Sequence, residues 1–335
     1  MSEKTAISRR DFLNISLPFL AGVVSACTPH SDSPSFLTPT LEPSPRPTAV
    51  PTPKTFAETP EAGWKIPTPE QIRAWAKDPG FWSKKLGPSQ NPIFVDQWDP
   101  NQYPGYSNPE YSLPGFMNNA CVLASLTMAR RWSHYIFTGD IPTEINIMQT
   151  LNSLIGKTYV IGRHKNENLI IDPDRGSLIN LFAIKTALEV LDSETHYYTV
   201  VETTPKPVFS DCTIPPRKGK RKIETLCVDN PIPYGEWQGV FDKTITEVTS
   251  QGGLPLFFVY KYGWGHVSLF PDIPQDINED VLVLDPRGAN EKGFIAKMPI
   301  TKYTKAVAYG LGVVPNLPNQ SSWRGYNKTV NAPRR

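Results

Sequence analysis

The sequence predicts an α+β fold, because segments with helical patterns come early in the chain and most segments with strand patterns follow them. Short connections join the later strands, as in antiparallel hairpins, whereas a parallel sheet would need a helix between successive strands. A hydrophobic content of 39% over 335 residues is enough for one sizeable core. We therefore expect N-terminal helices packed on an antiparallel sheet.

Apolar residues at helical spacing and recognisable end signals define the predicted helices. In the first, Thr68 is a suitable N-cap, Pro69 takes the first helical position and Gln71 completes a capping box. Residues 91–115 are rich in Pro, Asn and Tyr and predict an ordered loop. The predicted helices cover residues 69–77, 121–133, 142–155, 177–192 and 236–251.

The predicted strands are rich in β-branched and aromatic residues. Their number and order favour an antiparallel sheet over a doubly wound parallel one. They cover residues 196–202, 254–260, 266–270, 281–285 and 306–314.

The first 26 residues are predicted to be a signal peptide. Arg9 and Arg10 form a positive segment, and residues 12–26 form an apolar run that ends in small residues. Such a run is too short to span a bilayer. The stretch SRRDFL at residues 8–13 resembles a twin-arginine export signal, so we expect export from the cytoplasm.

The stretch VSAC at residues 24–27 resembles the cleavage box of bacterial lipoproteins. Cleavage before Cys27 would leave a thiol for diacylglycerol and an amine for another acyl chain, and two chains together anchor a protein stably. The alternative is an ordinary signal peptide with a coincidental cysteine. The lipoprotein interpretation predicts a lipid-anchored chain on the extracytoplasmic side of the cell membrane.

Residues 27–62 are predicted to be a tether, because Pro, Ser and Thr dominate them. Such a segment buries little apolar surface and is extended and semi-rigid. It would hold the folded domain, residues 63–315, away from the lipid surface; the alternative is a tail without a role. Residues 316–335 are predicted to be a polar, basic tail.

The charge balance argues against nucleic-acid binding, since 34 Lys and Arg face 32 Asp and Glu. The basic run RKGKRK at residues 217–222 can contact anionic polymers or lipid headgroups, or can simply be a solvated loop. The chain has no glycine-rich nucleotide loop and no His/Cys pair with zinc-ligand spacing. We expect a monomer without metal or cofactor.

The four cysteines have separate interpretations. Cys27 is the predicted lipid site, and Cys212 and Cys227 are predicted to form a disulfide after export, unless they are two free thiols. This leaves Cys121 at the start of the most apolar predicted helix, where the helix dipole stabilises a thiolate. The alternative is that Cys121 is a packing residue.

His266 is the histidine best placed to activate a thiol. It enters a predicted strand beside Gly263 and Gly265, which permit close approach of another group. It follows Cys121 by about 145 residues, within the roughly 130–150 that separate Cys and His in papain-like enzymes.

Asp285 is a candidate partner of His266. If Phe270 pairs with Val281 in a hairpin, His266 lies directly opposite Asp285, with Cβ atoms about 5 Å apart. A carboxylate there can orient the imidazole. The alternative is a structural Asp in the turn at residues 285–288. The same register places four apolar residues on the other face: Val267, Leu269, Leu282 and Leu284.

Three stretches around these residues resemble the bacteriocin-processing cysteine peptidases (peptidase family 39) and their stand-alone relatives, which have a papain-like fold. The first combines DQWD at residues 96–99 with NACVLASLTM at 119–128. The others are GHV at 265–267 and VLDP at 283–286. The chain departs from the family directly after the cysteine, where Val122 and Leu123 replace the usual Gly and frequent Pro.

The resemblance implies a thiol peptidase with an oxyanion-hole Gln97, a nucleophilic Cys121, a general-base His266 and an orienting Asp285. These residues occur in the family's chain order. The expected partners are a peptide or protein substrate and, through the lipid on Cys27, the membrane. Two alternatives remain open: an inactive papain-like domain that binds peptide or cell-wall material, and a transglutaminase-like acyl transferase with the same triad.

Overall fold

The computed structural model describes nine stretches of the chain: residues 60–109, 112–154, 182–205, 209–214, 223–228, 232, 234–261, 264–288 and 292–318. Several predictions fall outside these stretches: the signal peptide with Arg9 and Arg10, the lipid site Cys27, nearly all of the tether, the basic run 217–222 and most of the tail.

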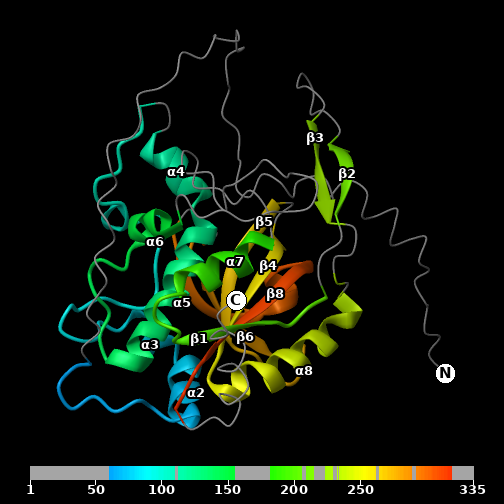
Figure 1. Cartoon of the computed structure of the whole chain (residues 1–335). Coiled ribbons are helices and arrows are strands. Elements are labelled where there is room, and N and C mark those ends of the chain that lie inside the picture. The colour runs from blue at the N-terminus through cyan, green and yellow to red at the C-terminus, as the bar shows by residue number, and fades with distance from the viewer. Residues whose placement is uncertain are drawn as a thin grey trace, which may run out of the picture.

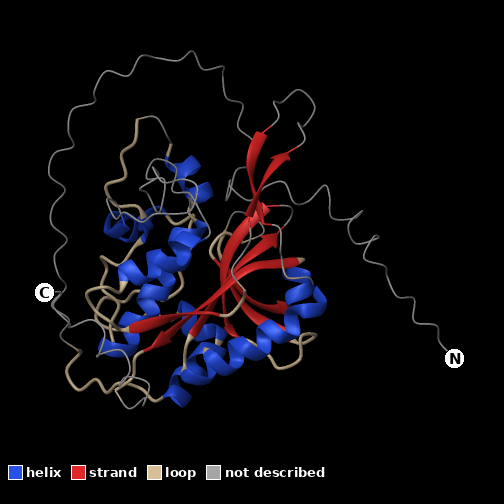
Figure 2. Ribbon diagram, turned by 45° about the vertical axis from the view of Figure 1, so that its right-hand side comes forward, coloured by secondary structure: helices blue, strands red, loops and turns tan. Residues whose placement is uncertain are grey.

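A six-stranded antiparallel sheet forms the centre of the protein, with the strand order β1-β8-β4-β5-β6-β7 (Figures 1 and 2). A separate antiparallel pair, β2 with β3, projects from it. All five predicted strands are confirmed, whereas β7, β2 and β3 were not predicted. The strands are β1 (Tyr198–Glu202), β2 (Phe209–Ile214), β3 (Ile223–Val228), β4 (Leu254–Lys261), β5 (Trp264–Asp272), β6 (Asp280–Asp285), β7 (Phe294–Pro299) and β8 (Ala306–Pro315).

Helices cover both faces of this sheet, and a hydrophobic cluster lies under each layer. The larger cluster contains residues of α2 to α7, and the smaller contains residues of α8 and α9. The structure therefore confirms the α+β class. The helices are α2 (Pro69–Lys77), α3 (Pro79–Ser83), α4 (Leu113–Asn119), α5 (Cys121–Thr138), α6 (Ile147–Leu154), α7 (Phe182–Leu191), α8 (Trp237–Glu247) and α9 (Ile300–Tyr303).

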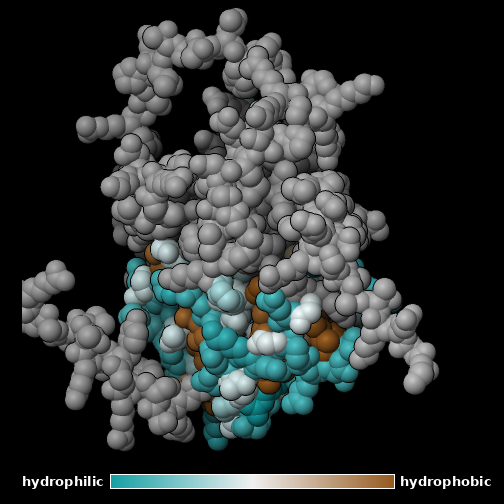
Figure 3. All heavy atoms as spheres, turned by 90° about the vertical axis from the view of Figure 1, so that its right-hand side faces the viewer, coloured by the Kyte–Doolittle hydropathy of each residue, from teal (hydrophilic) through white to brown (hydrophobic). Residues whose placement is uncertain are grey.

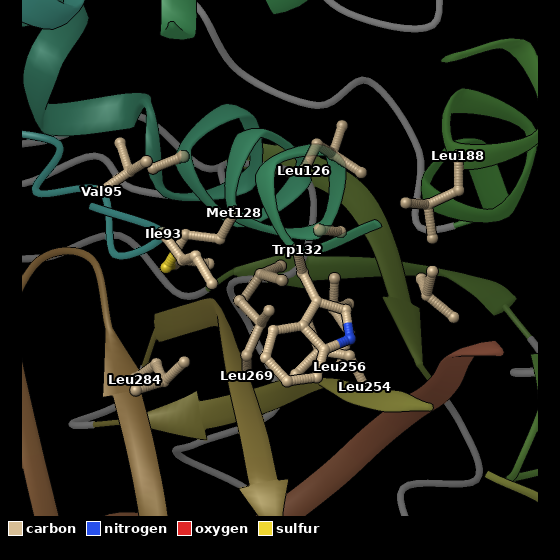
Figure 4. Packing of buried hydrophobic residues seen from close by; sticks show 14 of the residues in the cluster. Ile93, Val95, Leu126, Met128, Trp132, Leu188, Leu254, Leu256, Leu269 and Leu284 are labelled. Atoms are coloured by element: carbon tan, nitrogen blue, oxygen red, sulfur yellow. The ribbon is translucent and has the colours of Figure 1, made fainter. Parts of the chain in front are cut away.

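The larger core lies between α5 and the sheet. In Figure 4, Trp132 of α5 lies beside Leu269 of β5, and Met128 of α5 lies beside Ile93. Leu284 of β6 belongs to the same cluster. Alternate strand residues face the other way, and Phe270 belongs to the smaller cluster. The predicted division of β5 and β6 into two faces is therefore confirmed, as the period of two requires.

The ends of the helices follow their capping residues. Thr68 and Gln71 form the predicted capping box at the start of α2. The helix predicted from residue 142 begins only at Ile147, because the side chain of Asn146 accepts the backbone N–H of Gln149 and acts as the cap. Its start was therefore predicted too early, although the existence of the helix is confirmed.

The described surface is largely polar. Figure 3 shows one face of the molecule, on which hydrophilic residues predominate and hydrophobic ones form small separate spots. Among the described large hydrophobic residues, Ile66 is exposed, with 40% of its surface accessible. The described part of the chain contains no helix with the length and apolarity that a membrane span requires.

Candidate active site

His266 of β5 and Asp285, the last residue of β6, form a buried hydrogen bond. His266 Nε2 lies 2.7 Å from Asp285 Oδ1, and neither side chain is exposed. The sequence pattern thus predicted this pair of partners. The predicted alignment of the two strands, however, is not the one observed.

The predicted register of β5 and β6 is wrong by two residues, because Leu284 pairs with Leu269 and not with Val267. A shift of two keeps every side chain on its predicted face. The imidazole of His266 then reaches Asp285 across the diagonal of the ladder. An irregularity between Leu269 and Asp272 changes the alignment along the hairpin, and the sequence gives no direct signal for it.

Both interpretations of Asp285 hold in the structure, since the same carboxylate orients His266 and organises a turn. Its Oδ1 atom also accepts the backbone N–H groups of Arg287 and Gly288, each at 2.8 Å. Its Oδ2 atom accepts the hydroxyl of Tyr303, also at 2.8 Å. These donors fix the carboxylate in one orientation and compensate for its burial.

Cys121 is the first residue of α5, directly after Ala120, which ends α4 and caps α5. Cys121 is not part of a disulfide, and its side chain is fully buried. One helical turn further along α5, the hydroxyl of Ser125 donates to the backbone carbonyl of Val267 at 3.1 Å. Because Val267 adjoins His266 in β5, this bond holds the start of α5 next to the imidazole.

The pKa of His266 is raised from 6.5 to about 9. Burial lowers it, but the charge and hydrogen bond of Asp285, together with a hydrogen bond and charge from Cys121, outweigh the burial. The imidazole thus binds Asp285 through Nε2 and also interacts with the side chain of Cys121. The interactions with Asp285 and Cys121 therefore favour the protonated imidazole.

Gln97 lies at the junction of α4 and α5. Its backbone N–H donates to the carbonyl of Pro286 at 3.0 Å, next to Asp285. Its side-chain Nε2 donates to the carbonyl of Met117 at 2.7 Å, and the backbone N–H of Ala120 donates to the same carbonyl at 3.2 Å. The buried amide thus lies beside the N-terminus of the Cys121 helix, with a second proton that this bond does not use.

A buried arginine that sequence reasoning missed holds the loop that carries Gln97. Arg131 of α5 donates to the carbonyls of Ile145 and Pro92 and to the side chain of Gln102, at 2.7, 2.9 and 3.2 Å. Burial lowers its pKa to about 10, so it stays charged at neutral pH. Its position among the apolar residues of the predicted helix could have indicated a buried arginine.

Sequence reasoning also missed the residues behind Asp285, namely Tyr303 and Ser268, and the anchor Ser125. Ser268 lies two residues after His266 in β5, and the two side chains therefore share a face of the strand. A polar residue at that position was a signal that the sequence analysis could have used. Tyr303 belongs to the short helix α9, which is too short to show a helical pattern in the sequence. Its position depends on the packing of α9 against the smaller core.

The two departures from the family pattern are core residues. Val122 and Leu123 are fully buried in the larger cluster. Helix α5 still begins at Cys121, and its backbone bond from Ala124 N–H to Ala120 C=O is 2.8 Å long. Both residues therefore contribute to the packing of the larger core.

The predicted disulfide remains a prediction, because the side chains of Cys212 and Cys227 lie outside the described part of the structure. The backbone register pairs Cys212 with Thr225 and Cys227 with Ser210. The two cysteines therefore occupy diagonal positions of the β2–β3 hairpin.

Among the described residues, no group of three or more His, Cys, Asp or Glu side chains is arranged to hold a metal ion. Comparison of the chain with models of known protein families, with curated proteins and with solved structures gives no match.

Replacement of Gly288 is expected to disrupt the Asp285 turn. Gly288 has a φ of +69°, and an added Cβ would overlap the backbone carbonyl of Lys292. We expect Gly288→Ala to lower the free energy of unfolding by about 3 kcal/mol or more. Gly105→Ala is the matched control, since its φ is +71° and nothing lies within 4 Å of the added Cβ. It should cost only about 1–2 kcal/mol; equal losses in urea unfolding would contradict this prediction.

Proposed function

We propose that the chain is a membrane-anchored extracytoplasmic thiol peptidase with a papain-like fold. The observation that carries the proposal is the position of His266, which binds Asp285 through Nε2 and also interacts with the side chain of Cys121. A nucleophile, a base and an orienting acid in this order form the triad that cleaves amides by acyl transfer.

The arrangement of secondary structure supports the papain-like part of the proposal. The thiol is at the N-terminus of a buried helix that packs on an antiparallel sheet, and the His and Asp come from neighbouring strands. Export and lipid attachment are proposed from the sequence before residue 60. They would place the domain where extracytoplasmic peptides are its substrates.

The proposed reaction starts from a thiolate–imidazolium pair. The sulfur of Cys121 attacks the amide carbonyl carbon, and the carbonyl π electrons move onto oxygen. The oxyanion is stabilised by the side chain of Gln97 and by the backbone N–H of Cys121 at the helix N-terminus. The C–N bond then breaks as His266 gives its proton to the leaving amine. Water, deprotonated by His266, hydrolyses the thioester and restores the thiol.

A second candidate function is supported by the burial of the site. The side chains of Gln97, Cys121, His266 and Asp285 are all fully buried, so a substrate reaches the thiol only after a local opening. A domain that binds peptide without cleaving it would not need such an opening. Cleavage of a bound peptide separates the two functions.

Cys121→Ala is expected to abolish peptide cleavage, because it removes the nucleophile of the proposed reaction. The full chain would be incubated with a mixed-sequence peptide library, and new peptide ends identified by mass spectrometry. Cys121→Ser is the size-matched control and should also be inactive, since a serine hydroxyl is not ionised by His266 at neutral pH. Equal cleavage by wild type and Cys121→Ala would refute the proposal; retention of peptides without cleavage would favour the binding domain.

A further inference from the structure

We propose that Tyr303, supported by Ser268, is the positioning residue that keeps the Asp285 carboxylate ionised and aligned with His266. The inference rests on the proposed function, because it extends the triad by a further layer. It concerns residues that the resemblance to the peptidase family did not supply.

The two carboxylate oxygens of Asp285 have different hydrogen-bond partners. Oδ1 of Asp285 accepts His266 Nε2 and two backbone N–H groups. Oδ2 accepts the hydroxyl of Tyr303 at 2.8 Å. Tyr303 comes from α9, outside the β5–β6 hairpin, and is only 3% exposed. Its hydroxyl therefore fixes the rotation of the carboxylate from the side opposite the imidazole.

The hydrogen bonds of Ser268, Tyr303 and Asp285 run in one direction. Ser268 Oγ is bonded to the hydroxyl of Tyr303. An ionised carboxylate only accepts, so Tyr303 gives its single proton to Asp285. Ser268 must then donate to Tyr303, which forms a directed chain from Ser268 through Tyr303 and Asp285 to His266. Such chains polarise their members and strengthen the bond to the charged group.

The hydroxyl of Tyr303 keeps its proton and therefore remains a hydrogen-bond donor. Burial raises its pKa well above 10, and the charges of Asp285 and Cys121 act in the same direction. The ring is also held in place, since it packs edge-on against Phe270 and Phe294, with centroids 5.7 and 6.5 Å away. Besides Asp285, the turn contains the charged residue Arg287, whose backbone N–H donates to Asp285 Oδ1.

The test follows the protonation of Asp285 in the full chain carrying Cys121→Ala. The ¹⁵N chemical shift of His266 is followed as the pH is lowered. It should change in a step when the nearby Asp285 carboxylate takes up a proton. Tyr303→Phe removes a hydrogen bond to the buried charge of Asp285. It should raise the pH of this step by about one unit, which is about a tenfold increase in the proton affinity of Asp285. Ser268→Ala should move it in the same direction by less.

The matched control is Tyr309→Phe. Tyr309 is buried in β8 and also donates to a carboxylate, that of Glu202, at 2.6 Å. Its replacement should lower stability without moving the step. An unmoved step in Tyr303→Phe, with only a lower melting temperature, would overturn the inference. The readout needs no substrate, so it is independent of activity. A moved step, together with no peptide cleavage by the chain that retains Cys121, would reject the peptidase and leave the role of Tyr303 intact.

Discussion

Asp285→Asn is expected to reduce kcat for peptide cleavage by about 10³- to 10⁴-fold while leaving the protein folded. The negative charge of Asp285 is a main reason that the pKa of His266 is raised to about 9. Without it, the burial of His266 dominates and lowers that pKa. The imidazole then loses its proton at a lower pH, and the thiolate of Cys121 loses its counter-ion.

The hydrogen-bond geometry indicates that the fold tolerates this change. The amide oxygen of the asparagine can take the place of Oδ1 and accept the N–H groups of Arg287 and Gly288. Its NH₂ group then faces the hydroxyl of Tyr303, which can accept from it and donate to Ser268. The variant therefore removes the charge and leaves few buried groups without a partner.

The measurement is the pH profile of kcat together with urea unfolding. We expect near-normal unfolding and an alkaline limit of activity that moves to lower pH. Unchanged kcat would show that Asp285 is only the organiser of its turn. A large loss of stability would instead mean that the asparagine cannot satisfy the turn.

Gln97→Ala is expected to lower kcat by about 10²- to 10³-fold, or about 2.7–4 kcal/mol of transition-state stabilisation, with little change in KM. The reason is that the Gln97 amide lies beside the start of α5, where the oxyanion forms, and contributes only once the charge develops.

Gln102→Ala is the control, because Gln102 lies in the same loop and bonds to Arg131 away from the junction of α4 and α5. It should alter stability more than kcat. Equal kcat for wild type and Gln97→Ala would remove Gln97 from the mechanism and leave it a structural link to Met117 and Pro286.

The parts of the fold that the sequence predicted are those with a repeating pattern. The period of two in β5 and β6 predicted the faces correctly, and an error of two in register did not matter because it preserves the face. The long apolar repeat of α5 predicted a buried helix with Cys121 at its start.

The parts that the sequence could not predict depend on contacts between distant segments. Helix α9 has only the four residues Ile300–Tyr303, too few for a periodic pattern, yet it supplies the hydroxyl that binds Asp285. Arg131 was hidden for a similar reason, since its partners are backbone carbonyls of two separate loops. Spacing and the expected hairpin made Cys121, His266 and Asp285 candidates, whereas Gln97 was a candidate only through the resemblance to the peptidase family.

The central claim is that His266 holds Cys121 as a thiolate, and the alkylation rate of Cys121 as a function of pH tests it most directly. The full chain would be treated with iodoacetamide, and Cys121 followed by peptide mass spectrometry, apart from the other three cysteines. Burial slows the reaction similarly at every pH, so the shape of the profile reports the ionisation. His266→Gln is the comparison, because glutamine keeps a neutral N–H donor for Asp285.

We predict a plateau of rapid alkylation that extends well below pH 7 in the wild type and is lost in His266→Gln. A rate that rises only near pH 8.5, the ordinary range of a free thiol, and does so alike in both proteins would contradict the account.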